Sequence, residues 1–142
     1  MFFGNNVSDT RQLFYTSWIK YRQKQPLTAL EQQLVAVIID HPEYQPMLEK
    51  KGGVGEEAYF PEMGQANPFL HMGLHLAVRD QIATNKPIGI NQHFQRLSKK
   101  YNDSLVVEHM IIECLAECLW QAQRDNREPD EVSYLNNLSR LS

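Results

Sequence analysis

The sequence predicts an all-α protein, a helical bundle of four main helices with one or two shorter helices, formed as a single domain over residues 1–142. Apolar residues recur at helical spacing in several segments, and helix-start signals precede those segments. Strand-type alternation bounded by hairpin turns is not sustained anywhere in the sequence. With 142 residues, 42% of them hydrophobic, the chain is large enough to bury one core without disulfides.

The first two helices are predicted from their capping patterns. Residues 9–12 have the pattern of a capping box and open a helix over 9–23, which carries apolar residues at helical spacing and ends before Pro26. A second capping box at 28–31 opens a helix that continues to about Asp40, because Pro42 biases the preceding residue away from the α region.

The middle of the chain combines a short helix, a loop and a long helix. Residues 42–50 are predicted to form the short helix, and 51–66 carry turn residues without clear periodicity. A loop of that length is a candidate functional segment. Asn67 is a typical N-cap and Pro68 suits the first helical position, so a helix is expected from there to about Thr84.

Three further helices are predicted toward the C-terminus. One covers about 91–101, and Asn102-Asp103-Ser104 then forms a cluster of capping residues. Nothing interrupts a helix over 105–124, and the tail at 129–141 repeats the helical pattern.

Charge and hydropathy restrict the expected partners and location. A net charge of −3 with a pI near 5.9 provides no clustered basic face, so we expect no nucleic-acid partner. The longest apolar run, at 34–39, is far shorter than the roughly 18 residues of a membrane span, and the N-terminus has no signal-peptide pattern. The sequence therefore predicts a cytoplasmic protein without a membrane partner. Cys114 and Cys118 are interpreted as small buried hydrophobic residues.

Two polar rows stand out on otherwise apolar helices. His71 and His75 are one turn apart on the helix at 67–84. His109, Glu113 and Glu117 are spaced by four on the helix at 105–124, among apolar neighbours. Both rows are predicted to face the core, where ionisable groups must be paired, hydrogen-bonded or bound to a metal.

This spacing predicts a metal site. Ligands at i and i+4 are close enough to reach one cation, and facing helices of a bundle can build such a site. The set His71, His75, His109 and Glu113 suits zinc, or iron or manganese. Glu117 is predicted to be an acceptor that orients His109 or a ligand to a second ion, and in an enzyme Glu117 or Glu113 is the expected general base.

His41 has two interpretations. At the end of a helix, a cationic imidazole is favoured by the helix dipole. The functional alternative makes His41 a further metal ligand.

Two functions remain open from these residues. The first is a metal-binding helical bundle, such as a metal-dependent hydrolase or another metalloenzyme acting on a small-molecule substrate. The alternative is a non-catalytic adaptor or dimerisation module, a homodimer with a buried His/Glu hydrogen-bond network in place of a metal. The apolar row that motivates the dimer comprises Val132, Leu135, Leu138 and Leu141.

Several strings resemble a family of short bacterial proteins known as a domain of unknown function. They are His41-Pro42-Glu43-Tyr44, the segment 67–75 reading Asn-Pro-Phe-Leu-His-Met-Gly-Leu-His, and Glu108-His109 leading to Glu113-Cys114-Leu115. This resemblance implies no activity or substrate. In its chemistry alone the chain is also similar to hemerythrin-type and other histidine-rich metal bundles, which place such helices around iron. Here the order is reversed, with the His-x3-His pair preceding the His-x3-Glu pair.

Overall fold

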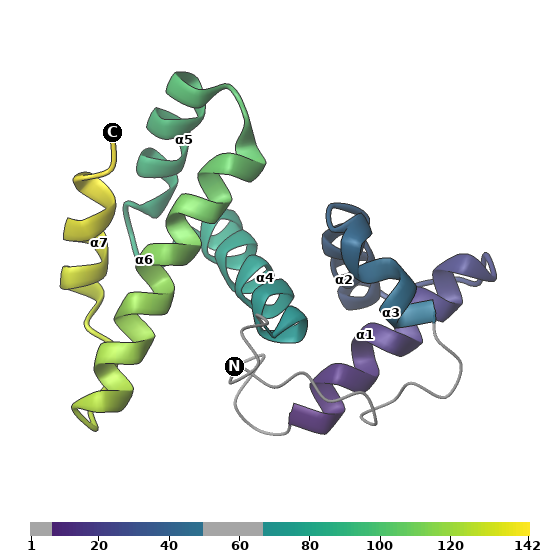
Figure 1. Cartoon of the computed structure of the whole chain (residues 1–142). Helices are drawn as coiled ribbons and strands as arrows, with labels where there is room; N and C mark the ends of the chain where they lie inside the picture. The colour runs from purple at the N-terminus through teal and green to yellow at the C-terminus, as the bar shows by residue number, and fades with distance from the viewer. Residues whose placement is uncertain (1–6, 50–66) are drawn as a thin grey trace. The chain divides into compact units, whose positions relative to one another are not determined.

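The structure, a computed structural model, is all-α and describes residues 7–49 and 67–142. These residues form seven α-helices and one short 3-10 helix, and they contain no strand (Figure 1). The fold class predicted from the sequence is confirmed. The predicted loop at 51–66 lies outside the described residues.

The chain divides into two compact units, Met1–Leu76 and Ala77–Ser142. The boundary falls inside the unbroken helix α4 (Pro68–Thr84), which contributes its first half to one unit and its second half to the other.

The first unit is built on an aromatic core. It contains α1 (Val7–Arg22), α2 (Ala29–Ile39), the 3-10 helix η1 (Pro42–Tyr44), α3 (Gln45–Glu49) and the start of α4. Phe69 of α4 lies against the rings of both Phe14 and Tyr15, with centroids 6.0 and 5.8 Å away. The aliphatic and aromatic residues around them complete one core, with Trp18, Leu34, Val35, Val37, Ile38, Leu48, Met72 and Leu76.

The second unit contains the rest of α4 and three helices that lie side by side (Figure 1). These are α5 (Ile90–Tyr101), α6 (Ser104–Arg124) and α7 (Glu131–Ser139). The guanidinium of Arg96 on α5 donates to the carbonyl oxygens of Leu138 and Leu141, so an arginine satisfies the end of α7.

Most helix boundaries follow the capping residues. Thr28 and Glu31 form the predicted capping box of α2, and Asp103 accepts from two backbone N–H groups at the start of α6. The start of α1 differs, because the helix begins at Val7 and Asp9 lies inside its first turn. An acidic residue in that turn is favoured by the helix dipole as well as at a cap, so the sequence pattern cannot separate the two positions.

The predicted count of four main helices is not confirmed. In the described residues five helices, α1, α2, α4, α5 and α6, have between 11 and 21 residues each.

Among the described helices, none combines the length and the hydropathy needed to cross a bilayer.

Candidate metal centre

His41 is held at the junction between α2 and η1. The helix α2 ends at Ile39, and His41 is buried, with an exposed fraction of 3%. Its Nδ1 lies 2.8 Å from the carbonyl oxygen of Val37 in the last turn of α2. A carbonyl oxygen only accepts, so Nδ1 carries the proton and donates, and Nε2 holds the lone pair. This tautomer, assigned from the hydrogen bond, presents Nε2 as the metal-binding atom.

His71 and His75 are positioned by the start of α4. The side chain of Asn67 accepts from the backbone N–H groups of Phe69 and Leu70, at 3.0 and 3.3 Å, which fixes where the helix begins. The two histidines then follow one turn apart on one side of the helix. His75 is fully buried and His71 is half-buried.

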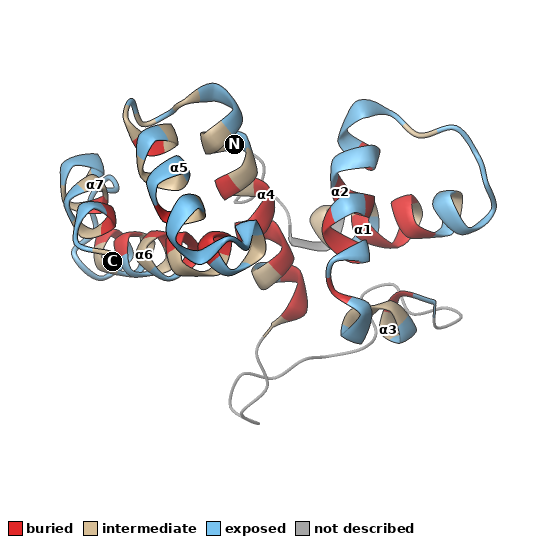
Figure 2. Ribbon diagram, turned by 90° about the horizontal axis from the view of Figure 1, so that it is seen from above, coloured by how far each residue is buried: buried red, intermediate tan, exposed pale blue. Residues whose placement is uncertain are grey.

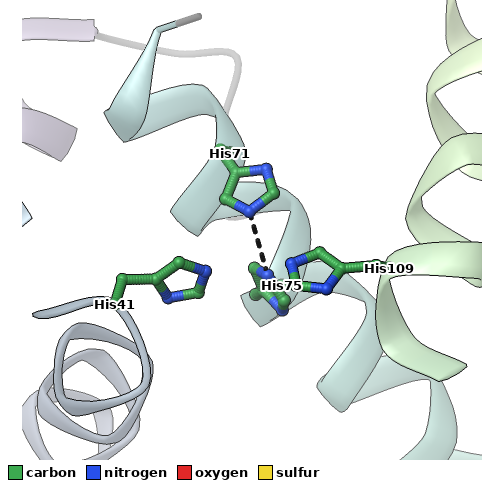
Figure 3. A group of neighbouring side chains, drawn as sticks. All are labelled: His41, His71, His75 and His109. Carbon is green, nitrogen blue, oxygen red and sulfur yellow. Dashed lines mark hydrogen bonds between the residues drawn. The ribbon is translucent and has the colours of Figure 1, made fainter. Parts of the chain in front are cut away.

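The imidazoles of His71 and His75 point their Nε2 atoms at each other, 3.2 Å apart (Figure 3). Two nitrogen ligands about 2.05 Å from a tetrahedral zinc ion lie about 3.3 Å apart. The spacing of this pair therefore matches that of two ligands on one ion. It is equally the spacing of a hydrogen bond between two neutral rings, one donating and the other accepting.

His41 completes a group of three histidines within the first unit. Its ring centroid lies 5.0 Å from that of His71 and 4.6 Å from that of His75. One ligand nitrogen from each ring lies within 4.8 Å of those of the other two. Tightening the widest such separation around one ion requires ring movements of about 1 Å. We call His41, His71 and His75 the histidine cluster.

Tyr44 of η1 packs against this cluster. Its ring is stacked on that of His41, at 5.4 Å between centroids and 5° between planes. The same ring meets His71 edge-on at 6.3 Å. The stacking contact with His41 and the edge contact with His71 leave the imidazoles of these two histidines few alternative orientations.

His109, also drawn in Figure 3, belongs to the second unit, where α6 carries it half-buried. The residue before it, Glu108, is buried and accepts from Arg79 Nε at 2.9 Å. The sequence interpretation missed this ion pair. The spacing of the residues could have indicated it, because Arg79 follows His75 by four residues, as His75 follows His71.

The prediction that Glu113 and Glu117 face the core is wrong. Both are exposed, and Glu117 accepts a hydrogen bond from the side chain of Gln121 at 2.9 Å. The apolar residues expected beside them are partly outside as well, with Val106 and Trp120 exposed by 42% and 54%. The buried face of α6 is turned to the other side and contains Val107, Glu108, Ile111, Ile112, Leu115, Cys118 and Ala122.

The physical reason is that α6 is apolar around most of its circumference. A helix of this kind has no single stripe that fixes which way it turns, so tertiary packing decides. The ion pair with Arg79 helps to fix the rotation of α6, because it requires Glu108 to face α4.

Both cysteines of α6 are free thiols. Cys118 is buried, as the sequence predicts, whereas Cys114 is only half-buried. Burial raises the pKa of each thiol, and Glu113 raises that of Cys114 further. Neither cysteine is therefore a ready thiolate nucleophile at neutral pH.

Comparison with known proteins identifies a family and no activity. A family model described as a domain of unknown function (DUF1841) matches residues 6–140. Neither the comparison with curated proteins nor that with solved structures gave a match.

Proposed function

The chain belongs to the DUF1841 family, a domain family of unknown function, so we propose a function from its side chains alone: the protein binds one divalent transition-metal ion through His41, His71 and His75. The observation that carries the proposal is the convergence of three imidazoles, two of them buried, within a single unit.

The ligand chemistry favours zinc. Imidazole nitrogen is a borderline ligand that suits zinc and also iron, copper and nickel, whereas manganese prefers oxygen ligands. The carboxylate that made manganese suitable was Glu113, which is exposed on α6. An all-imidazole set is neutral, so it holds the ion through the strength of its nitrogen ligands rather than through charge.

The hydrogen bond from His41 Nδ1 to Val37 supports the same proposal. Metal-binding histidines generally donate their second ring nitrogen to a carbonyl or carboxylate, which fixes the tautomer and the ring orientation. His41 has this arrangement at 2.8 Å.

Hydrolysis is not included in the proposal. A metal-dependent hydrolase requires a metal-bound water and a base beside it. The base expected from the sequence was Glu117, which lies on the exposed face of α6 with Gln121 as its partner.

A second candidate is a scaffold in which the histidines form a buried hydrogen-bond network without a metal. The 3.2 Å contact between His71 and His75 favours it, because this contact gives the Nε2 atom of each ring a hydrogen-bond partner without an ion. The two candidates differ in whether metal adds stability.

The experiment uses the full chain purified without a histidine tag. Elemental analysis is expected to give about one zinc ion per chain, and removal by a chelator followed by Zn²⁺ is expected to raise the unfolding temperature. At a free concentration of about 100 times Kd, the gain is about 2.7 kcal/mol. His75→Ala is expected to abolish both signals.

His93→Ala is the matched control. His93 is a half-buried histidine of the second unit that contacts Arg96, and it does not belong to the histidine cluster. This variant should keep the metal content and the zinc-dependent stabilisation of the wild type. A wild-type chain that binds no zinc, iron, nickel or copper at micromolar concentration would reject the proposal in favour of the hydrogen-bond network.

A further inference from the structure

We infer that Tyr44 is a positioning residue for the proposed metal ion, and that it acts through His41 by fixing the plane of that imidazole. The inference rests on the proposed function and deepens it, because it names the side chain that prepares one of the three ligands before the metal binds. His41 and Tyr44 are both in the first unit, as are His71 and His75.

The first step is the backbone turn that joins the two residues. The backbone N–H of Tyr44 donates to the carbonyl oxygen of His41 at 2.9 Å, and this bond closes the 3-10 helix η1. Side chains three residues apart eclipse one another in such a helix. Pro42 lies at the start of η1, where its fixed φ is compatible with helical backbone. The sequence from His41 to Tyr44 therefore brings the two rings to the same side of the turn.

The second step is the attachment of this turn to α2. The carbonyl oxygen of Ile38 accepts from the backbone N–H of His41 at 3.0 Å and from the side chain of Gln45 at 3.3 Å. These two donors flank η1, one on each side. A displacement of Tyr44 away from His41 would therefore break hydrogen bonds to the last turn of α2.

The third step is the constraint on the His41 ring. Its hydrogen bond to the carbonyl oxygen of Val37, at 2.8 Å, fixes the position of Nδ1 but leaves the ring free to rotate about that bond. The Tyr44 ring lies parallel to the imidazole within 5°, at 5.4 Å between centroids, and so fixes the plane of the imidazole. In that plane His41 meets His71 and His75 edge to face, at 5.0 and 4.6 Å between centroids (Figure 3). The hydrogen bond and the stacking together hold the orientation in which the three imidazoles converge.

The aromatic face of Tyr44 supplies this constraint, and the hydroxyl group is not required. Stacking depends on a flat ring, so phenylalanine at this position should preserve it. An aliphatic side chain offers no such face, and His41 must then lose rotational freedom when it binds the ion. Loss of a group that orients a metal ligand typically weakens metal binding by about 10- to 100-fold.

Tyr44→Leu and Tyr44→Phe test the inference in the full chain, with Zn²⁺ alone as the probe. Competition with a chromophoric chelator measures the affinity at a temperature at which every variant is folded by circular dichroism. Tyr44→Leu should bind Zn²⁺ at least about tenfold more weakly than the wild type. Tyr44→Phe should stay within about twofold of the wild type, because it keeps the ring. A loss in Tyr44→Phe as large as that in Tyr44→Leu would contradict the inference, since the hydroxyl group would then carry the effect.

Leu27→Ala is the matched control for lost packing. Leu27 is half-buried and packs against the same core as Tyr44, and it does not belong to the histidine cluster. Its substitution should lower the free energy of unfolding of the metal-free chain, yet leave the Zn²⁺ affinity within about twofold of the wild type. An equal loss of affinity in Leu27→Ala and Tyr44→Leu would show a general effect of packing and overturn the positioning role.

A double-mutant cycle with His41→Ala tests whether Tyr44 acts through His41. Cu²⁺ is the probe, because it binds nitrogen ligands more tightly than the other divalent ions of its row and keeps binding by the remaining pair, His71 and His75, measurable. With His41 present, Tyr44→Leu should weaken Cu²⁺ binding by about tenfold or more. In the His41→Ala chain the same substitution should change the Cu²⁺ affinity by less than about twofold. A purely structural role of Tyr44 would give the same loss in both chains, and that result would reject the inference.

The behaviour of the wild type separates this inference from the function on which it rests. If the wild type binds neither Zn²⁺ nor Cu²⁺, the proposed function fails and the inference fails with it. If the wild type binds metal and Tyr44→Leu binds it equally well, the proposed function stands and only the role of Tyr44 is overturned.

Discussion

The polar rows of α4 and α6 have the same spacing in the sequence, yet the structure treats them in opposite ways. His71 and His75 on α4 lie inside, with His75 fully buried in the run Met72–Leu76, which is buried without a break (Figure 2). On α6, Glu113 and Glu117 lie outside, and only His109 is half-buried.

The difference comes from what surrounds each row. All five residues of α4 from Met72 to Leu76 are buried, so around His75 the helix has no exposed face to which a polar side chain can turn. On α6 the helix can rotate until its carboxylates reach water, and an unpaired buried carboxylate costs several kcal/mol. A polar row is therefore good evidence of an interior site only when its helix is buried all round.

The largest expected effect tests the rotation of α6. Ile111 is fully buried, whereas Val106 is 42% exposed. Ile111→Ala is expected to lower the free energy of unfolding by about 2–5 kcal/mol, because it deletes buried carbons and leaves a cavity. Val106→Ala should change it by about 0.5 kcal/mol or less. Urea unfolding followed by circular dichroism measures both, and similar losses would mean that α6 is rotated differently.

A smaller effect is expected at the start of the α4 row. Asn67→Ala removes the side-chain acceptor of the Phe69 and Leu70 N–H groups and should lower the free energy of unfolding by about 1 kcal/mol. Asn67→Asp keeps an acceptor and serves as the control. Equal stability of the alanine and aspartate variants in the same urea titration would count against this cap.

A third test contrasts a paired carboxylate with the exposed ones of α6. The backbone N–H of Thr28, 2.8 Å away, and then Lys20 hold the pKa of Glu31 below its usual value of 4.5. A carboxyl whose pKa is lowered by folding stabilises the protein above that usual value, and the stabilisation is lost as the pH falls through the lowered pKa.

Glu31→Gln should therefore be less stable than the wild type at pH 7, and the two should converge on acidification below pH 4.5. Thermal unfolding over a pH series measures the gap. Lys20→Gln removes one of the two contacts and should produce a smaller gap of the same sign. A gap that stays constant with pH would exclude the titration of Glu31 as its cause.

The smallest expected effect belongs to the exposed carboxylates. Glu113→Ala and Glu117→Ala should each change the free energy of unfolding by about 0.5 kcal/mol or less and leave the metal content unaltered. The comparison is with His75→Ala, measured by the same elemental analysis. Loss of metal in either glutamate variant would show that the substituted glutamate takes part in metal binding.

Short-range chemistry accounts for the part of the fold that the sequence predicts. The caps at Thr28, Asn67 and Asp103 act on N–H groups two or three residues away, and they place the helices correctly. The division into two units, with its boundary between Leu76 and Ala77 inside a helix, has no such local signature. Helical periodicity continues across that boundary without a change.

The candidate site divides in the same way. The spacing in the sequence is enough to pair His71 with His75. His41 joins them through tertiary structure. The sequence suggests a metal ligand as only one of two interpretations of His41. Glu113 shares a row with His109, but a helical wheel gives relative directions and not the direction of the core. Which way α6 turns depends on contacts such as that of Glu108 with Arg79, distant in sequence.

The hydrogen bond between His41 and Val37 links the electronic properties of an imidazole to the end of α2. The carbonyl groups in the last turn of a helix carry the partial negative charge of its dipole. By accepting a hydrogen bond from Nδ1–H, the Val37 carbonyl oxygen raises the electron density of the ring and makes Nε2 a stronger electron donor. Fraying of the last turn of α2 would make Nε2 of His41 a weaker donor and free the ring to change tautomer. The metal affinity would therefore depend on how well α2 is formed at its end.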